Sequence, residues 1–377
     1  MEDRPATLWD IARLFLKLGT TAFGGPAAHI AMLQQEVVER RGWLSQEEFL
    51  DHLGASNLIP GPTSTELVIH VGRRKGGWSG LLVAGSCFIL PAALMVGAIA
   101  WAYVRFGKLP AVSGLLYGVK AVVIAIIVQA MWKLGRTAIK RVSLAIVAVV
   151  ALLLSAMGVA PLLVLVVGGF LAVVMSLDAP RAKAALLSLS VPAAASSAAG
   201  ASAGLWPIFL VFAKIGAMVF GSGYVLLAFL HADLVERLGW ITQQQLLDAV
   251  AVGQVTPGPV FTTATFLGYL LHGTGGAVAA TVGIFVPAFL FVAVSAPLIP
   301  KIRASRIAGA ALDGINVASL GLMAVVTWQL ARAALVDSTT VAVAGVSALA
   351  LFAYPRLNSA WLIAGAGLLG ALRYVIA

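Results

Sequence analysis

The sequence predicts an all-α integral membrane protein made of two inverted-topology repeats with proline-broken helices. Three observations predict this fold: the chain is very apolar, it contains its own first half a second time, and its positive charges change sides between the two copies. Sixty per cent of the residues are apolar and 11% are charged, whereas about a quarter of the residues of a soluble domain are charged. The mean hydropathy of +0.99 therefore predicts a multi-pass chain surrounded by a lipid bilayer.

The internal duplication divides the chain. Residues 15–66 align with residues 212–263 at a constant offset of 197, and 19 of these 52 positions are identical. The offset then becomes 196, so that Pro91 matches Pro287. A duplicated, Gly- and Pro-interrupted unit in an apolar chain is typical of secondary transporters, whose substrate site lies where the copies meet. We expect three parts: an N-terminal repeat over 1–177, an Ala/Ser-rich cytoplasmic linker over 178–204, and an inverted C-terminal repeat over 205–377.

Each repeat is expected to contain the same elements in the same order. A weakly apolar region broken by glycines comes first, over 7–41 and 205–237. Two short helices then flank a Pro-Gly-Pro triplet, because proline ends one helix and suits the first turn of the next. These helices are expected over 46–58 and 62–72, and over 243–255 and 259–271.

Four apolar segments follow in each repeat. Because about 20 apolar residues cross the ~30 Å hydrocarbon layer as a helix, these segments predict membrane spans. With one net crossing from each broken region they give about ten net crossings, and re-entrant segments within 7–74 and 205–271 are the open alternative. The segments are 77–104, 111–131, 142–157 and 160–177, then 275–299, 307–331, 339–353 and 359–376.

The basic residues between the spans predict that the repeats are inverted. In the first repeat they gather before 77–104 and between the second and third spans, at Arg136, Lys140 and Arg141. In the second repeat the matching places are poor in positive charge, and the opposite loops carry Lys301, Arg303, Arg306 and Arg356. Since cytoplasmic loops are enriched in Lys and Arg, matching spans should run in opposite directions, with the linker in the cytoplasm.

The two Pro-Gly-Pro triplets predict the substrate site. At membrane depth, irregular backbone persists only where protein covers it or where it lines a cavity, and the helix start after each break is suited to an anion. The alternative is a kink used for packing, with the nearby hydroxyls bonded back to the helix. The predicted binding residues are Asn57, Pro60, Gly61, Pro62, Thr63, Ser64 and Thr65 in one copy, and Gln254, Pro257, Gly258, Pro259, Thr262 and Thr263 in the other.

Two further matched features are candidates for the same site. The glycine clusters at Gly24 and Gly25, and at Gly221, Ser222 and Gly223, could present backbone N–H groups to a ligand, although close helix packing explains them equally well. Lys17 and Lys214 occupy one repeat position in an apolar context. They could converge near the midplane and offset the charge of an anion, or they could snorkel to the interface.

Other charged residues are candidates for coupling or gating. Glu36, Glu39 and Arg40 match a second stretch that includes Glu236 and Arg237, and an interfacial helix end explains both stretches well. Glu66 and His70 lack a repeat partner and suit proton coupling, with a capped or water-facing pair as the alternative. No phosphate-binding loop or zinc-binding spacing occurs in the sequence, so we expect no cofactor, no metal and no catalytic residue. The basic residues that give the chain its net charge of +10 lie between the predicted spans, where they set the orientation of the chain in the membrane. We therefore expect no nucleic-acid partner.

These motifs together carry a resemblance. Phe-Gly-Gly-Pro-x-x-His-Ile with Gly-Trp-Leu and Pro-Gly-Pro, repeated as Phe-Gly-Ser-Gly-Tyr, Gly-Trp-Ile-Thr and Thr-Pro-Gly-Pro, resembles the long-chain, bidomain type of the chromate ion transporter (CHR) family. The resemblance implies a bacterial-type inner-membrane carrier that exports chromate, with sulfate as the analogue, driven by an ion gradient whose ion is unknown.

Alternatives to that reading stay open. A carrier of this kind could move another anion, such as sulfate or a lipid phosphate. An intramembrane enzyme is the less favoured class, since it would need a paired nucleophile and base within a span. A homodimer is a further possibility.

Overall fold

The computed structural model describes residues 6–23, 25–107, 109–176, 203–220, 223–295, 305–354 and 357–376. Every element within these ranges is helical, which confirms the predicted class. The predicted linker lies almost wholly outside the described residues, as do Gly24, Gly221 and Ser222.

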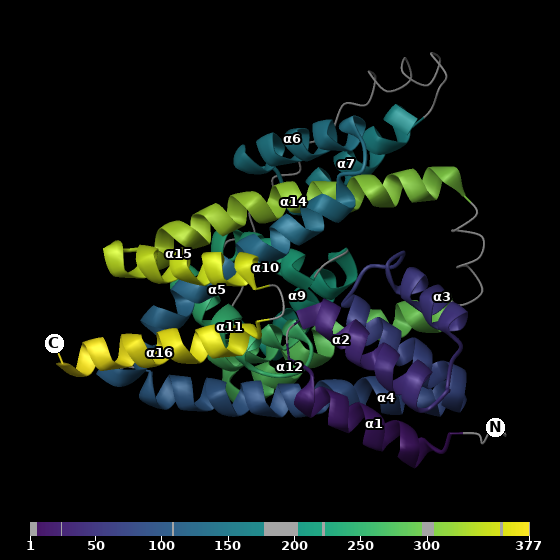
Figure 1. The fold of residues 1–377 in the computed structure, drawn as a ribbon, viewed down its shortest axis with the longest axis horizontal. Helices are drawn as coiled ribbons and strands as arrows, with labels where there is room; N and C mark the ends of the chain where they lie inside the picture. The colour runs from purple at the N-terminus through teal and green to yellow at the C-terminus, as the bar shows by residue number, and fades with distance from the viewer. Residues whose placement is uncertain are drawn as a thin grey trace.

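The helices recur in the same order in the two halves of the chain (Figure 1). The first half contains α1 (Leu8–Thr21), α2 (Gly25–Gln34), the π-helix η1 (Gln35–Arg40), α3 (Gln46–Ser56), α4 (Thr63–Phe106), α5 (Pro110–Ala138), α6 (Val142–Ala156) and α7 (Pro161–Ser176). The second half contains α9 (Leu205–Met218), η2 (Gly223–Val225), α10 (Leu226–Leu230), η3 (His231–Arg237), α11 (Gln243–Val255), η4 (Val260–Thr262), α12 (Thr263–Ser295), α14 (Arg306–Ala334), α15 (Ser338–Ala353) and α16 (Ser359–Ile376).

Local sequence explains why the short helix before each break starts where it does. The Ser45 hydroxyl accepts a hydrogen bond from the Glu48 N–H, and the Glu48 carboxylate accepts one from the Ser45 N–H. Thr242 and Gln245 form the same reciprocal pair at the start of α11. Such capping boxes satisfy N–H groups that the first turn leaves without acceptors.

The helix after each break folds back on itself. In α4 the chain leaves helical geometry at Gly76 and Gly77, where Gly77 has a φ of 60°. A side chain at Gly72 would meet Gly80 and Ala84, so the 63–75 arm packs directly against the 78–106 arm. The helix is therefore a hairpin whose short arm begins at the Pro-Gly-Pro break, as a re-entrant segment would.

Helix α12 repeats this hairpin. Its turn lies at His272 and Gly273, where Gly273 has a φ of 57°, and Gly268 in the 263–271 arm lies against Gly276 and Ala280. A positive φ is strained for any residue with a side chain. Glycine at the same place in both repeats is thus a requirement of the turn.

The long arms of α4 and α12 are neighbours that run in opposite directions. Near the start of the α4 long arm, Gly85 lies against Phe289, late in α12. Twelve residues further along α4, a Cβ atom at Gly97 would lie 3.9 Å from Thr265 in the α12 short arm. The Thr265 hydroxyl lies 2.7 Å from that of Thr281, which is eight residues before Phe289 in the α12 long arm. Antiparallel packing of matched elements is the geometry of an inverted repeat.

The last helices of each repeat pack on the other repeat. Helices α6 and α7 lie against α14 (Figure 1), while α15 and α16 lie against α5. Small residues allow the close approach: Gly118 meets the backbone of Ala366, and its counterpart Gly314 meets Gly168. Such contacts hold helices together where the hydrophobic effect is absent. Each repeat therefore completes the packing of the other.

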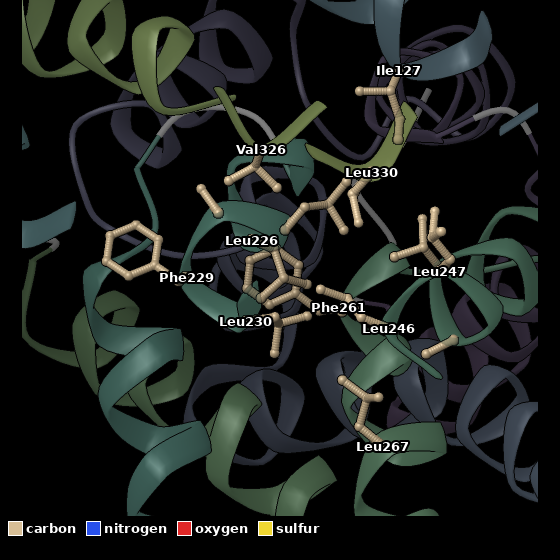
Figure 2. Close-up of a cluster of buried hydrophobic side chains, with 14 of the residues drawn as sticks. Ile127, Leu226, Phe229, Leu230, Leu246, Leu247, Phe261, Leu267, Val326 and Leu330 are labelled. Atoms are coloured by element: carbon tan, nitrogen blue, oxygen red, sulfur yellow. The ribbon is translucent and has the colours of Figure 1, made fainter. Parts of the chain in front are cut away.

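The largest apolar cluster is built mostly from the second repeat with residues of α4 and α5, and a smaller one around Phe15, Phe49 and Phe88 lies in the first repeat. In the large cluster, side chains of α10, α11, α12 and α14 interdigitate with Ile127 of α5, and Phe261, just after the second break, lies among them (Figure 2). Within the described ranges, four helices (α4, α5, α12 and α14) are long and apolar enough to cross a membrane. The other apolar helices are shorter: the 15 residues of α6 extend about 22 Å. The number of crossings stays a prediction.

Candidate functional site

One pocket brings the two Pro-Gly-Pro breaks together. Pro62, Thr63 and Ser64 line it from the first repeat, and Pro259, Val260 and Phe261 occupy the matching positions on its other side. His29 and Gly223 complete the lining. Because the first N–H groups of a helix have no acceptor within that helix, two sets of backbone donors and two positive dipole ends converge here.

A reciprocal pair of hydrogen bonds fixes this meeting point. The Gly61 N–H donates to the Val219 carbonyl at 2.7 Å, and the Gly258 N–H donates to the Ala22 carbonyl at 2.9 Å. Gly61 matches Gly258 and Ala22 matches Val219 at the repeat offset of 197. Each break is thus bonded to the end of the first helix of the opposite repeat. These two glycine N–H groups bond the repeats together, whereas the residues after Pro62 and Pro259 line the pocket.

The two sides of the pocket differ in polarity. Thr63 and Ser64 present hydroxyls, while Val260 and Phe261 at the matched positions are apolar. Thr262 and Thr263, which were expected to bind the ligand, donate their hydroxyls to the carbonyls of Pro259 and Val260, each at 2.8 Å. In this conformation the Thr262 and Thr263 hydroxyls are bonded back to the helix, as in the packing alternative, and their part in binding stays a prediction.

His29 belongs to the quoted Phe-Gly-Gly-Pro-x-x-His-Ile motif, but it was not among the predicted binding residues. Its Nε2 lies 3.0 Å from the Ala22 carbonyl, and its Nδ1 lies 3.3 Å from the Ser64 hydroxyl. Because a carbonyl only accepts, Nε2 carries the hydrogen. A neutral ring then accepts from Ser64. The available signal was a histidine three residues after Pro26 in an apolar segment.

The pocket is nearly closed in this conformation. Its volume of about 10 Å³ holds roughly one water molecule, and a four-oxygen anion needs more room. The breaks would have to separate slightly to admit one, which a carrier that alternates between open and closed forms requires.

Three other predicted binding residues flank the breaks. Asn57 ends α3 and is exposed, and Gln254 is half-buried near the end of α11. Thr65 is fully buried, and its hydroxyl has no hydrogen-bond partner among the described residues. Within the described chain, all three lie outside the pocket lining.

Lys17 and Lys214 pair with carboxylates of their own repeats. Lys17 Nζ lies 2.8 Å from Glu36, and Lys214 Nζ lies 2.8 Å from Asp233. The lysine side chains are 54% and 41% exposed, and among the described residues neither lines the pocket. Their participation in substrate binding stays a prediction.

Each of these two carboxylates also forms an ion pair with an arginine one helical turn later in the chain. Arg40 lies 3.0 Å from Glu36, and Arg237 lies 2.7 Å from Asp233. Arg41 also lies 3.6 Å from Glu36, so the buried carboxylate has three cationic partners in the first repeat and two in the second. Glu39 is exposed, and Glu236 lies 3.4 Å from His231.

Glu66 and His70 lie on one face of the α4 short arm, one turn apart. Both are buried, and neither Glu66 oxygen has a hydrogen-bond partner among the described residues. A side chain at Gly61 would touch the Glu66 carboxyl, so this acid lies beside the break.

Paired helix breaks that meet inside an apolar, two-repeat helical fold define a multi-pass membrane transporter of the broken-helix class. A family model described as "Chromate transporter" matches residues 9–173 and 206–371, which are the two repeats. The chain belongs to the chromate transporter family.

Full-length relatives agree with this assignment. The chain is 33% identical over 378 residues to the chromate transport protein of Cupriavidus metallidurans, covering 98% of this chain and 94% of that protein. It is 35% identical over 378 residues to the chromate transport protein of Pseudomonas aeruginosa, covering 95% and 90%. No solved structure matches the chain. Family membership makes the protein a membrane ion transporter rather than an enzyme.

Proposed function

We propose that this protein exports a tetrahedral oxyanion, chromate with sulfate as its analogue, across the bacterial inner membrane by alternating access. The observation that carries the proposal is the convergence of two helix starts, one from each repeat, on one pocket. Matched half-helices pointing their positive ends at a shared site are how inverted-repeat carriers hold anionic groups.

The pocket chemistry suits an oxyanion. Thr63 and Ser64 offer hydroxyls from one side, and the backbone N–H groups after Pro62 and Pro259 offer donors from both sides. Among the described residues no carboxylate lines the pocket. The relatives named chromate transport protein support chromate as the substrate.

The direct test is radiolabelled chromate flux in proteoliposomes under imposed proton and sulfate gradients. The double variant Thr63→Val/Ser64→Ala should lose most of the flux, because it gives the first repeat an apolar wall like that of the second. Thr262→Val is the matched control, since its hydroxyl is bonded to its own helix. Normal flux in the double variant, or no flux in the parent, would refute the proposal.

Competition by sulfate and by lipid phosphates in the same assay distinguishes the alternative substrates.

A further inference from the structure

A buried acid lies next to the anion pocket. Glu66 is 0% exposed, and neither carboxyl oxygen has a hydrogen-bond partner among the described residues. It follows the pocket residue Ser64 by two positions in the first turn of α4. An ionised carboxyl buried without a partner is very costly, so these surroundings favour the neutral acid.

Two histidines continue from this acid toward α3. His70 follows Glu66 by one helical turn, is 3% exposed, and its Nε2 has no hydrogen-bond partner within the described part of the chain. The His52 ring of α3 stacks on it, with ring centroids 5.4 Å apart and planes at 27°. His52 is half-buried. The three side chains form a column from the break toward the surface of α3.

The second repeat has an apolar residue at both histidine positions of the column. At the offset of 197, His52 matches Ala249. His70 lies past the aligned stretch and matches Leu267 at that offset or Phe266 at the offset of 196, and all three counterparts are 0% exposed in the large apolar cluster. Figure 2 shows Leu267 in that cluster. Glu66 matches Thr263, whose hydroxyl is bonded to its own helix. Since the fold accommodates uncharged residues at these places, the titratable column of the first repeat is not a packing requirement.

Other charged groups around the column are already paired. On α2, His29 contacts Ser64 and the Ala22 carbonyl. On α3, Glu48 pairs with Arg74 at 3.2 Å. On α4, Arg73 donates to the carbonyls of Val292 and Ala293 of α12. On α1, Lys17 pairs with Glu36, and α12 meets the break through Ala288. His29 is therefore the one competing titratable group among the described residues of the pocket lining.

We propose that Glu66 is a proton-binding site whose occupancy is linked to anion binding in the neighbouring pocket, and that His70 and His52 give protons access to it. The proposal rests on the proposed function and names its coupling ion. An ionised Glu66 would repel an oxyanion bound one turn away, through a medium of low dielectric. The anion therefore binds to the form with Glu66 protonated, and one proton moves with each anion. A divalent oxyanion and its proton leave together with one net negative charge, so an inside-negative membrane potential drives the export.

The experiment measures proton uptake on anion binding by the purified full chain in weakly buffered detergent solution. Sulfate is the probe, because it does not itself take up protons near neutral pH, and a thermal-shift titration measures its binding in parallel. Above the pH at which Glu66 ionises in the free protein, the parent should take up about one proton per bound sulfate, and its affinity should fall about tenfold per pH unit. Below that pH, sulfate should bind without proton uptake. Glu66→Gln should abolish both effects while still binding sulfate.

Matched variants separate the candidates. Thr263→Val, at the counterpart of Glu66, should keep the proton uptake. His70→Leu should slow the uptake without changing its final amount. Uptake that survives in Glu66→Gln, or that disappears in His29→Leu while Glu66 is intact, would overturn the proposal.

Two outcomes keep this inference distinct from the proposed function. Sulfate binding without proton uptake in the parent at every pH at which the protein stays folded refutes the inference alone, whereas no binding of sulfate or chromate refutes the proposed function. If Glu66→Gln does not fold, infrared difference spectra of the parent decide the matter. Addition of sulfate above the pH at which Glu66 ionises should produce a protonated-carboxyl band, and the lack of that band would refute the proton site.

Discussion

At the scale of single residues, the glycine in each break meets two separate constraints. Gly258 has a φ of +92°, and a Cβ there would lie 2.6 Å from the Ala92 side chain and 3.2 Å from the Gly19 carbonyl. Gly61 has a φ of +141° and faces the Glu66 carboxyl. One constraint is backbone strain and the other is contact with the opposite repeat or with the acid. Both constraints keep the pocket in place.

We expect Gly258→Ala to lower the unfolding temperature and to abolish most transport. Strain of this kind costs about 1–3 kcal/mol, and the contact with Ala92 adds to it by pushing the break away from α4. Gly135→Ala is the control, because Gly135 lies within α5 and a Cβ there would meet nothing within 4 Å. Thermal unfolding and flux measured on both variants test the expectation. Equal behaviour of the two would show that the break tolerates a side chain.

Asp337 gives a pH-dependent prediction outside the spans. The Tyr117 hydroxyl first, then the Thr340 N–H and the nearby Arg373, hold the pKa of Asp337 below its ordinary value. A depressed folded-state pKa contributes stability above the unfolded value, about pH 4, and loses it as pH falls through the folded pKa. The difference in unfolding temperature between the parent and Asp337→Asn should be constant above about pH 4 and should shrink below it.

Replacement of Asp337 by asparagine removes the negative charge but keeps the helix cap, because asparagine caps a helix start well. The experiment therefore measures the effect of the charge. Asp313→Asn is the control, since Asp313 forms an exposed pair with Lys140 at 3.3 Å, and exposed pairs contribute little. A parent-to-variant difference at Asp337 that does not change with pH would contradict the expectation.

At the scale of elements, the hairpins of α4 and α12 determine where the breaks lie. Their short arms start at the pocket and end at a glycine turn, so a 44-residue helix does not cross the membrane as one rod. The reason is a glycine with positive φ at Gly77 and small residues where the arms touch. The depth of the pocket therefore depends on contact between arms as well as on proline.

Two substitutions in the α4 hairpin should show how much the turn and the contact between the arms each contribute to stability. Gly72→Ala should destabilise strongly, because the new methyl group would meet Gly80 and Ala84, and overpacking costs about 1–3 kcal/mol. Gly77→Ala meets nothing within 4 Å and should cost only the strain of its φ, about 1 kcal/mol. Thermal unfolding in detergent ranks the two, and a larger loss at Gly77 would show that the turn dominates.

At the scale of the whole molecule, the exchange of helices bears on how the carrier could move. Helices α15 and α16 pack against α5, and helices α6 and α7 pack against α14. If the carrier works by alternating access, the bodies that move would then combine helices of both repeats, and α5 and α14 are in contact where these groups meet. Rocking of one complete repeat against the other would break these contacts.

The interlocked packing predicts that neither repeat is stable alone. Residues 1–190 and 191–377 expressed separately should be degraded, because each leaves the other's long helix without its partners. Co-expression of the two fragments should restore a folded protein that unfolds in one transition. Two fragments that are each stable alone would contradict the exchange.

The inverted topology predicts labelling from opposite faces of the membrane. In a Cys87→Ala background, cysteines placed at Arg74 and at His272 occupy the matched hairpin turns, and both positions are exposed. A membrane-impermeant thiol reagent added from one side should modify one of them and spare the other. Modification of both from the same side would exclude inversion despite the antiparallel long arms.

The sequence by itself determined the features that depend on near neighbours. Apolar runs predict helices in a bilayer, the offset of 197 predicts two copies, and the proline triplets predict the breaks. The capping boxes at Ser45 and Thr242 follow the same rule, since each is complete within four residues. All of these signals are local, or compare one stretch directly with another, and so they can be read without coordinates.

Only the tertiary structure decided which groups share the pocket. The approach of Thr63 to Val260, the contact of His29 with Ser64 and the pairing of Lys17 with Glu36 join residues far apart in sequence. Repeat symmetry predicts equal walls, yet packing makes one polar and embeds the other in the core. The physical reason is that side-chain partners depend on how helices approach one another. That approach is set by small residues and by the exchange of α6, α7, α15 and α16 between repeats, which no local pattern encodes.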